Sequence, residues 1–227
     1  QFLFNSKING LDETDCLLVV GSNVREEAPI INARIRKQVI SRDLPVALIG
    51  ENFDLTYKYE HLGNDVNILT DILYDKNEFS KKLLEAKKPM LIVGQSLLNR
   101  DDSIQIYSLL ESFIEKFNMA NDEWNGFNVL QLSASRAGSL EVGCYQKNKN
   151  LDDIIDDAHN NKVRLVMSFG ADEINYQHFE NSKIIYMGTH GDKGANAADI
   201  ILPSAAYTEQ DGIYINTEGR TQFANKA

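Results

Sequence analysis

Three glycine-containing turns hold most of the residues of this sequence that could bind a ligand or do chemistry. Gly21 follows the apolar run 16–20, Gly170 follows the run 163–169, and Gly188 follows the run 184–187. A glycine between a strand and a helix is where α/β folds point backbone N–H groups at a phosphate. We therefore expect the three turns to lie together at the carboxyl ends of parallel strands.

The first turn carries its own negative charge. Gly21 and Asn23 are followed by Glu26 and Glu27, and the phosphate-binding pattern Gly-x-Gly-x-x-Gly is absent. Carboxylates at a helix start take the positions that favour an anion. The residues alone leave two interpretations open, a phosphate site built on Gly21 and Asn23, or a helix start that its own glutamates satisfy.

The other two turns are also polar. Asp172 follows Gly170 closely and suits the start of a helix. Gly188 is followed by His190 and Lys193, which could form an anion nest or a proton-transfer site. One imidazole and one nearby carboxylate without an activated nucleophile define no reaction, however. A tight loop at the edge of a sheet is the favoured interpretation of this third turn.

The cysteines and histidines predict neither a metal site nor a catalytic group. An iron–sulfur cluster usually takes four cysteine ligands at close spacing, whereas this sequence has only Cys16 and Cys144, far apart. Cys16 lies in an apolar run and is expected to be a buried, inert thiol. His61, His159 and His178 are isolated and lack metal-ligand spacing. We expect no catalytic residue and no bound metal in this chain.

Composition excludes several classes of function. Hydrophobic residues make up 43% and charged residues 25% of the 227 positions, as in ordinary globular domains. The net charge of −10 argues against a nucleic-acid surface, which needs clustered lysine and arginine. No apolar run reaches the roughly 18–20 residues that cross a bilayer, so direct membrane insertion is not expected.

Short apolar runs alternate with helical patterns along the chain. Most runs lack period-two alternation, as expected for parallel strands covered on both faces. This predicts an α/β fold with a doubly wound, mainly parallel sheet. The expected strands are residues 16–20, 46–49, 90–93, 129–132, 163–169, 184–187, 200–202 and 213–216. The expected helices are residues 27–41, 78–86, 103–117 and 151–159. The expected core residues are Leu17, Val19, Ile49, Ile92, Leu165 and Ile201.

A seam between two lobes is expected near residue 88. Residues 57–88 are charged and weakly patterned, and they end in Lys87-Lys88-Pro89 before a fresh strand. The predicted division is a first α/β lobe at 1–88 and a second at 89–227. Because the chain starts at Gln1 without methionine, we also expect it to be part of a longer polypeptide.

The C-terminal region carries a specific string of residues. Asp199, the Leu202-Pro203 pair, Glu209, Gly212 and the segment 216–220 (Asn-Thr-Glu-Gly-Arg) occur in one fixed order. This order resembles the C-terminal signature of the molybdopterin-oxidoreductase superfamily. The blocks 21–37, 46–50, 54–57 and 86–90 are similar to the branch without the pterin cofactor, which is the large iron–sulfur subunit of respiratory NADH:quinone oxidoreductase, complex I.

This resemblance implies a molybdopterin-oxidoreductase-like domain that acts as a non-catalytic scaffold. Gly21, Asn23, Gly170, Gly188 and His190 would then be remnants of a cofactor site, with no cofactor bound in this chain. The iron–sulfur clusters would lie in an N-terminal part of the parent subunit. Partners would be other subunits of the complex I peripheral arm, on the cytoplasmic side of a bacterial inner membrane or the matrix side of the mitochondrial one. The alternative is a pterin-dinucleotide-binding module of a true molybdopterin oxidoreductase such as formate dehydrogenase.

Overall fold

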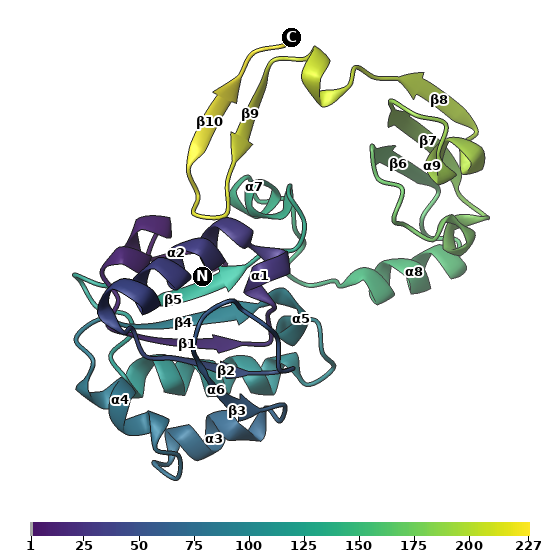
Figure 1. Cartoon of the computed structure of the whole chain (residues 1–227). Helices are drawn as coiled ribbons and strands as arrows, with labels where there is room; N and C mark the ends of the chain where they lie inside the picture. Colours follow the sequence, from purple (N-terminus) through teal and green to yellow (C-terminus); the bar gives the residue numbers. More distant parts are fainter. Residues whose placement is uncertain (1) are drawn as a thin grey trace. The chain divides into compact units, whose positions relative to one another are not determined.

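Two parallel sheets organise the chain, one in each of two separate units (Figure 1). The computed structural model describes residues 2–227. The first unit comprises the chain up to Glu141 together with Ile215–Thr221, and the second comprises Val142–Tyr214 and Gln222–Ala227. The predicted α/β class with mainly parallel sheets is confirmed.

The first unit is built on a five-stranded sheet with the order β3-β2-β1-β4-β5 and parallel pairing between neighbours. Its strands are β1 (Cys16–Val20), β2 (Val46–Ile49), β3 (Glu60–Gly63), β4 (Pro89–Gly94) and β5 (Phe127–Leu130). Its helices are η1 (Ile8–Asp12), α1 (Val24–Glu27), α2 (Pro29–Arg42), α3 (Asn67–Leu73), α4 (Phe79–Glu85), α5 (Gln95–Leu98), α6 (Ser103–Lys116) and α7 (Arg136–Glu141).

Helices cover both faces of this sheet. Leu18 and its same-face neighbours pack against α3, α4 and α6, whereas Leu17 and Val19 on the other face pack against α2 and η1. Figure 1 shows α2 on one side of the strands and α3, α4 and α6 on the other. Pro29 opens α2 where its missing N–H costs nothing, and Asp43 ends it with φ of 51°.

The second unit is built on a three-stranded sheet with the order β6-β7-β8, again parallel. Its strands are β6 (Leu165–Phe169), β7 (Lys183–Gly188) and β8 (Ile200–Pro203). The helices of this unit are α8 (Leu151–His159), η2 (Tyr176–Phe179), α9 (Lys193–Ala197) and η3 (Tyr207–Glu209), of which η2 and α9 connect the three strands. A two-stranded sheet, β9 (Gly212–Ile215) with β10 (Thr221–Ala224), follows, and its turn belongs to the first unit.

The expected seam at residue 88 lies inside the first sheet. β1 pairs with β2 on one side and with β4 on the other, so the strand that follows Lys88 lies directly beside β1. The compact units divide near residue 141 instead of between 1–88 and 89–227. Gln1, the first residue of the expected first lobe, lies outside the described residues.

The expected core is confirmed for the first unit and wrong for the second. Leu17, Val19 and Ile92 are fully buried and Ile49 is 2% exposed. Leu165 is 51% exposed and Ile201 is 52% exposed, because helices cover only one face of the second sheet and Ile201 lies on its edge strand β8. Within the described residues, no helix combines the length and the apolar character needed to span a membrane.

Candidate functional site

The first candidate turn follows β1 and is closed by close backbone packing. Gly21 adopts φ of 64°, and its N–H donates to the Ile49 carbonyl at 2.9 Å. A Cβ on Gly94, at the end of β4, would lie 2.0 Å from the Gly21 carbonyl oxygen. In open α/β sheets, ligands bind in the crevice at the point where the strand order reverses, which in this sheet lies between β1 and β4. The backbone of the two glycines fills that position.

Glu27 satisfies the polar groups of the same turn. Its carboxylate accepts a hydrogen bond from the Asn23 N–H at 2.9 Å and another from the Ser22 hydroxyl at 2.8 Å. These are donors that an α/β nucleotide site would direct at a phosphate. Of the two interpretations that the sequence left open, the geometry favours the one in which the glutamate caps the turn.

A small cavity remains at this edge of the sheet. It has a volume of about 270 Å³ and is lined by Gly21, Gly50, Ser96, Leu97 and Arg100, among others. Pockets that hold drug-sized ligands measure roughly 300–1,000 Å³. Arg100 is already paired with Asp102 at 2.7 Å. The cavity is therefore smaller than such pockets, and the guanidinium in its lining already has a carboxylate partner.

The other two candidate turns lie side by side in the second unit. Gly170, with φ of 61°, follows β6 and donates its N–H to the Met187 carbonyl at 2.7 Å, next to Gly188 at the end of β7. Gly21 and Asn23 belong to the first unit. The expectation that all three turns share one sheet edge is thus not met, because β1 belongs to a different sheet from β6 and β7.

Asp172 and Tyr186 fill the space around the third turn. Asp172 accepts a hydrogen bond from the Gly194 N–H in α9 at 2.8 Å and another from the Tyr186 hydroxyl at 2.9 Å. A Cβ on Gly188 or on Gly194 would lie 2.3–2.4 Å from atoms of Tyr186. The hydrogen bond to Asp172 raises the pKa of Tyr186 to about 12, so the hydroxyl remains a donor at neutral pH.

Among the described residues, His190 has a hydroxyl partner and no carboxylate hydrogen-bonded to its ring. The ring is exposed, and its Nδ1 lies 2.8 Å from the hydroxyl of the neighbouring Thr189. Over residues 2–227, no group of three or more histidine, cysteine and acidic side chains is placed to hold a metal ion. Cys16 is buried in the first sheet, and Cys144 is exposed in the second unit.

The family-like block at residues 21–37 has a role that the sequence reasoning did not find. Three of its side chains donate hydrogen bonds to three consecutive carbonyl oxygens of the loop before β3. The pairs are Arg25 with Asp54 at 2.7 Å, Asn32 with Leu55 at 3.2 Å, and Arg36 with Thr56 at 3.1 Å. The blocks 21–37 and 54–57 both stand out in the sequence, and a single strand, β2, separates them along the chain. This arrangement is the signal that could have found the role.

The C-terminal signature also forms a structural turn. The Asn216 side-chain oxygen accepts hydrogen bonds from the Glu218 and Arg220 N–H groups, and Gly219 adopts φ of 78°. Glu218 accepts a hydrogen bond from the Ile8 N–H at 2.7 Å. These contacts hold the start of the chain within the first unit.

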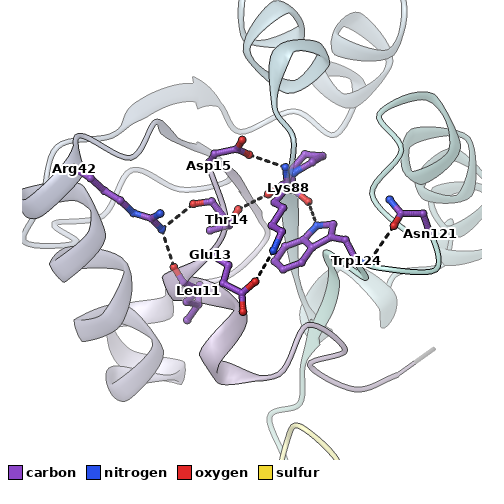
Figure 2. A network of polar contacts seen from close by, with 9 residues as sticks. Leu11, Glu13, Thr14, Asp15, Arg42, Lys88, Asn121 and Trp124 are labelled. Atoms are coloured by element: carbon purple, nitrogen blue, oxygen red, sulfur yellow. Dashed lines mark hydrogen bonds and ion pairs between the residues drawn. The ribbon is translucent and has the colours of Figure 1, made fainter.

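A polar network fixes the opposite end of the first sheet (Figure 2). Asp15 accepts hydrogen bonds from the Lys87 and Lys88 N–H groups, and Thr14 donates to the Lys88 carbonyl at 2.7 Å. Trp124 is 7% exposed and donates from Nε1 to the Pro89 carbonyl at 2.8 Å. Trp124 therefore caps a local core and ties it to the start of β4.

Comparisons with known proteins agree with this architecture. The family model for molybdopterin oxidoreductase matches residues 1–227. The chain is 43% identical over 227 residues to a subunit of the NADH-quinone oxidoreductase of Rickettsia bellii, covering 100% of this chain and 32% of that protein. It is 42% identical over 230 residues to the mitochondrial NADH-ubiquinone oxidoreductase 78 kDa subunit of Neurospora crassa, covering 100% of this chain and 30% of that protein.

A third relative comes from Reclinomonas americana. Its NADH-ubiquinone oxidoreductase 75 kDa subunit is 38% identical over 229 residues, with 100% of this chain and 33% of that protein covered. The chain thus spans about a third of the length of the curated relatives it matches. These relatives confirm the resemblance to the large subunit of complex I, and the match over residues 1–227 shows that the chain belongs to the molybdopterin oxidoreductase family.

Proposed function

We propose that this chain is a cofactor-free structural module of the peripheral arm of NADH:quinone oxidoreductase. Its role is to support electron transfer that is carried by iron–sulfur clusters in another part of the same subunit. The relatives, which are named as subunits of NADH-quinone and NADH-ubiquinone oxidoreductases, support the assignment to this complex. The partners are other peripheral-arm subunits, and the module lies on the cytoplasmic or the matrix side of the membrane.

One observation carries the cofactor-free part of the proposal. Carboxylates of the chain itself accept hydrogen bonds at two of the glycine turns, Glu27 from the Ser22 hydroxyl and the Asn23 N–H after β1, and Asp172 from the Gly194 N–H after β7. A diphosphate would have to displace a carboxylate and then lie beside it in a chain of net charge −10. A glycine whose N–H is already hydrogen-bonded can still have a structural use, as the close contact of Gly21 with Gly94 shows.

Calorimetric titration with a guanine dinucleotide tests this proposal. We expect no binding at ligand concentrations up to about 100 μM, and a molybdopterin enzyme that has been stripped of cofactor serves as the positive control. A dissociation constant in the low micromolar range, about −8 kcal/mol, would instead support a pterin-dinucleotide-binding module such as that of a formate dehydrogenase.

Iron analysis addresses the location of the clusters. The purified chain is expected to contain no stoichiometric iron and to oxidise no NADH, because Cys16 and Cys144 lie in different units and Cys16 is buried. Membership in the complex is tested by coexpression with the other peripheral-arm subunits of the same source. Failure of the complete subunit to copurify with them would contradict the assignment.

A further inference from the structure

One face of the second sheet is apolar and exposed. Alternate residues of β6, β7 and β8 point to this face, and the strand register places them in two rows that cross all three strands and a third row, Leu165 with Lys183, that joins β6 and β7 only. We define the open face by the six residues of the two rows that cross all three strands, which are Met167, Ile185 and Ile200 in one row and Phe169, Met187 and Leu202 in the other. Met167 is 52%, Phe169 65% and Ile200 52% exposed.

Helix α8, which precedes these strands, and the connecting helices η2 and α9 cover the opposite face. Val166 and Ile184, which alternate with the open-face residues, pack against α8 and η2 in a small core. Tyr186 lies on the same side, against Gly194 of α9. Because the strand order β6-β7-β8 follows the sequence, the two crossovers of the same hand lie on one side. The second unit therefore has no helix of its own for the open face.

Parallel sheets normally have both faces covered. Contiguous exposed apolar patches mark contact surfaces, and the open face carries no charge within its two rows. The charged residue nearest to the rows along β7 is Lys183, which is paired with Asp199 at 2.7 Å. This chemistry fits a dry apolar partner and not an acidic or basic one.

We propose that the open face docks an amphipathic helix supplied by the part of the longer polypeptide that the relatives possess beyond the stretch matching this chain. The relatives are about three times as long as the matched region, so they contain polypeptide from which such a helix can come. Five strand residues extend about 16 Å and three strands span about 10 Å. One helix of about 11 residues has this length and width.

Cysteine labelling measures whether the face is covered. In a Cys144→Ser background, Met167→Cys places a thiol on the open face, and Gln177→Cys places a matched control at an exposed position of η2. The maleimide reaction rate of each is measured in three samples, which are the 227-residue chain, the purified full-length subunit and the assembled complex. We expect Met167→Cys to react at least 10-fold more slowly in the full-length subunit than in the chain, with Gln177→Cys unchanged.

Three results would overturn the proposal. Protection already present in the 227-residue chain would mean that the chain covers the face itself. Protection that arises only in the assembled complex would assign the face to a partner subunit, and equal rates in all three samples would mean that it stays open. Phe169→Cys gives a second probe on the other row, in case Met167→Cys alters the fold. None of these results depends on whether a dinucleotide binds the glycine turns.

Discussion

The two sheets of this chain have similar sequences but different surroundings. β1 reads Cys-Leu-Leu-Val-Val and β6 reads Leu-Val-Met-Ser-Phe, and both are nearly continuous apolar runs followed by glycine. All five residues of β1 are buried, whereas three of the five in β6 are exposed. An apolar run therefore indicates that a strand is suited to burial on both faces. It does not show that the same stretch of chain supplies the helices that bury each of these two faces.

The largest expected difference between the units is in thiol reactivity. Burial, with a smaller contribution from the nearby Asp15 carboxylate, raises the pKa of Cys16 from 9.0 to about 12, whereas Cys144 is exposed. Each pKa unit is tenfold in thiolate, so ionisation alone makes Cys16 roughly a thousandfold less reactive near neutral pH than a thiol at the ordinary pKa. Iodoacetamide labelling with mass spectrometry should find one adduct, on Cys144.

The same thiol makes stability depend on pH. Its folded-state pKa lies above its unfolded value, so its contribution to the free energy of unfolding is fully present below pH 9. That contribution is lost as the pH rises from 9 to about 12, because the unfolded chain ionises first. Cys16→Ala, compared with Cys144→Ala, should flatten the decline of stability in this range. An identical decline in both variants would contradict the burial of Cys16.

Large-to-small substitutions compare the cores. Ile92→Ala in β4 removes a fully buried side chain and should lower the free energy of unfolding of the first unit by about 2–5 kcal/mol. Leu165→Ala in β6 removes a side chain that is 51% exposed and should cost about 0.5 kcal/mol or less. Urea unfolding with hydrogen exchange on peptides from each unit measures both. Equal costs would remove the distinction between a covered and an open sheet.

Glycine substitutions test the closed turn. Gly94 has φ of −72°, which alanine also adopts, but an added Cβ would lie 2.0 Å from the Gly21 carbonyl oxygen. Gly94→Ala should therefore destabilise the first unit by about 1–3 kcal/mol, as overpacking does. Gly191→Ala in the second unit meets no atom within 4 Å and should be nearly neutral. The midpoint of urea unfolding, followed by the fluorescence of the single Trp124, reports the first change.

Much of the fold was predictable because local patterns and packing agreed. Helix α8 begins and ends where the sequence predicted, at residues 151 and 159, because Asn150 and Asp153 cap its start. β3 and α3 were missed within residues 57–88, because β3 is a short edge strand with exposed residues and gives a weak apolar signal. β5 lies two residues earlier than expected, at 127–130, because pairing with β4 sets its register.

The candidate site was predictable only as a set of positions. The sequence placed Gly21, Gly170 and Gly188 at strand ends, and the structure has each of them there. The sequence could not show that Gly21 follows a strand of one sheet while Gly170 and Gly188 follow strands of another, because strand order depends on pairing between distant segments. Glutamates near Gly21 made a capped turn one of two interpretations, whereas the filling of the third turn by Tyr186 depends on packing across β7 and α9.

The smallest expected effect concerns backbone strain in the loop before β3. Thr56 has φ of 70°, which is unfavourable for a β-branched residue, and Arg36 holds its carbonyl. A left-handed conformation costs about 1–2 kcal/mol in a residue other than glycine. Glycine in turn lowers the free energy of unfolding by about 0.5–1 kcal/mol, because it has more conformational entropy to lose when the chain folds. Thr56→Gly should therefore stabilise the first unit by about 0.5–1 kcal/mol in urea unfolding. Thr208→Gly is a matched exposed control in the second unit, without positive φ, and should have the opposite sign. Destabilisation by both substitutions would mean that the Thr56 side chain contributes more than its backbone strain costs.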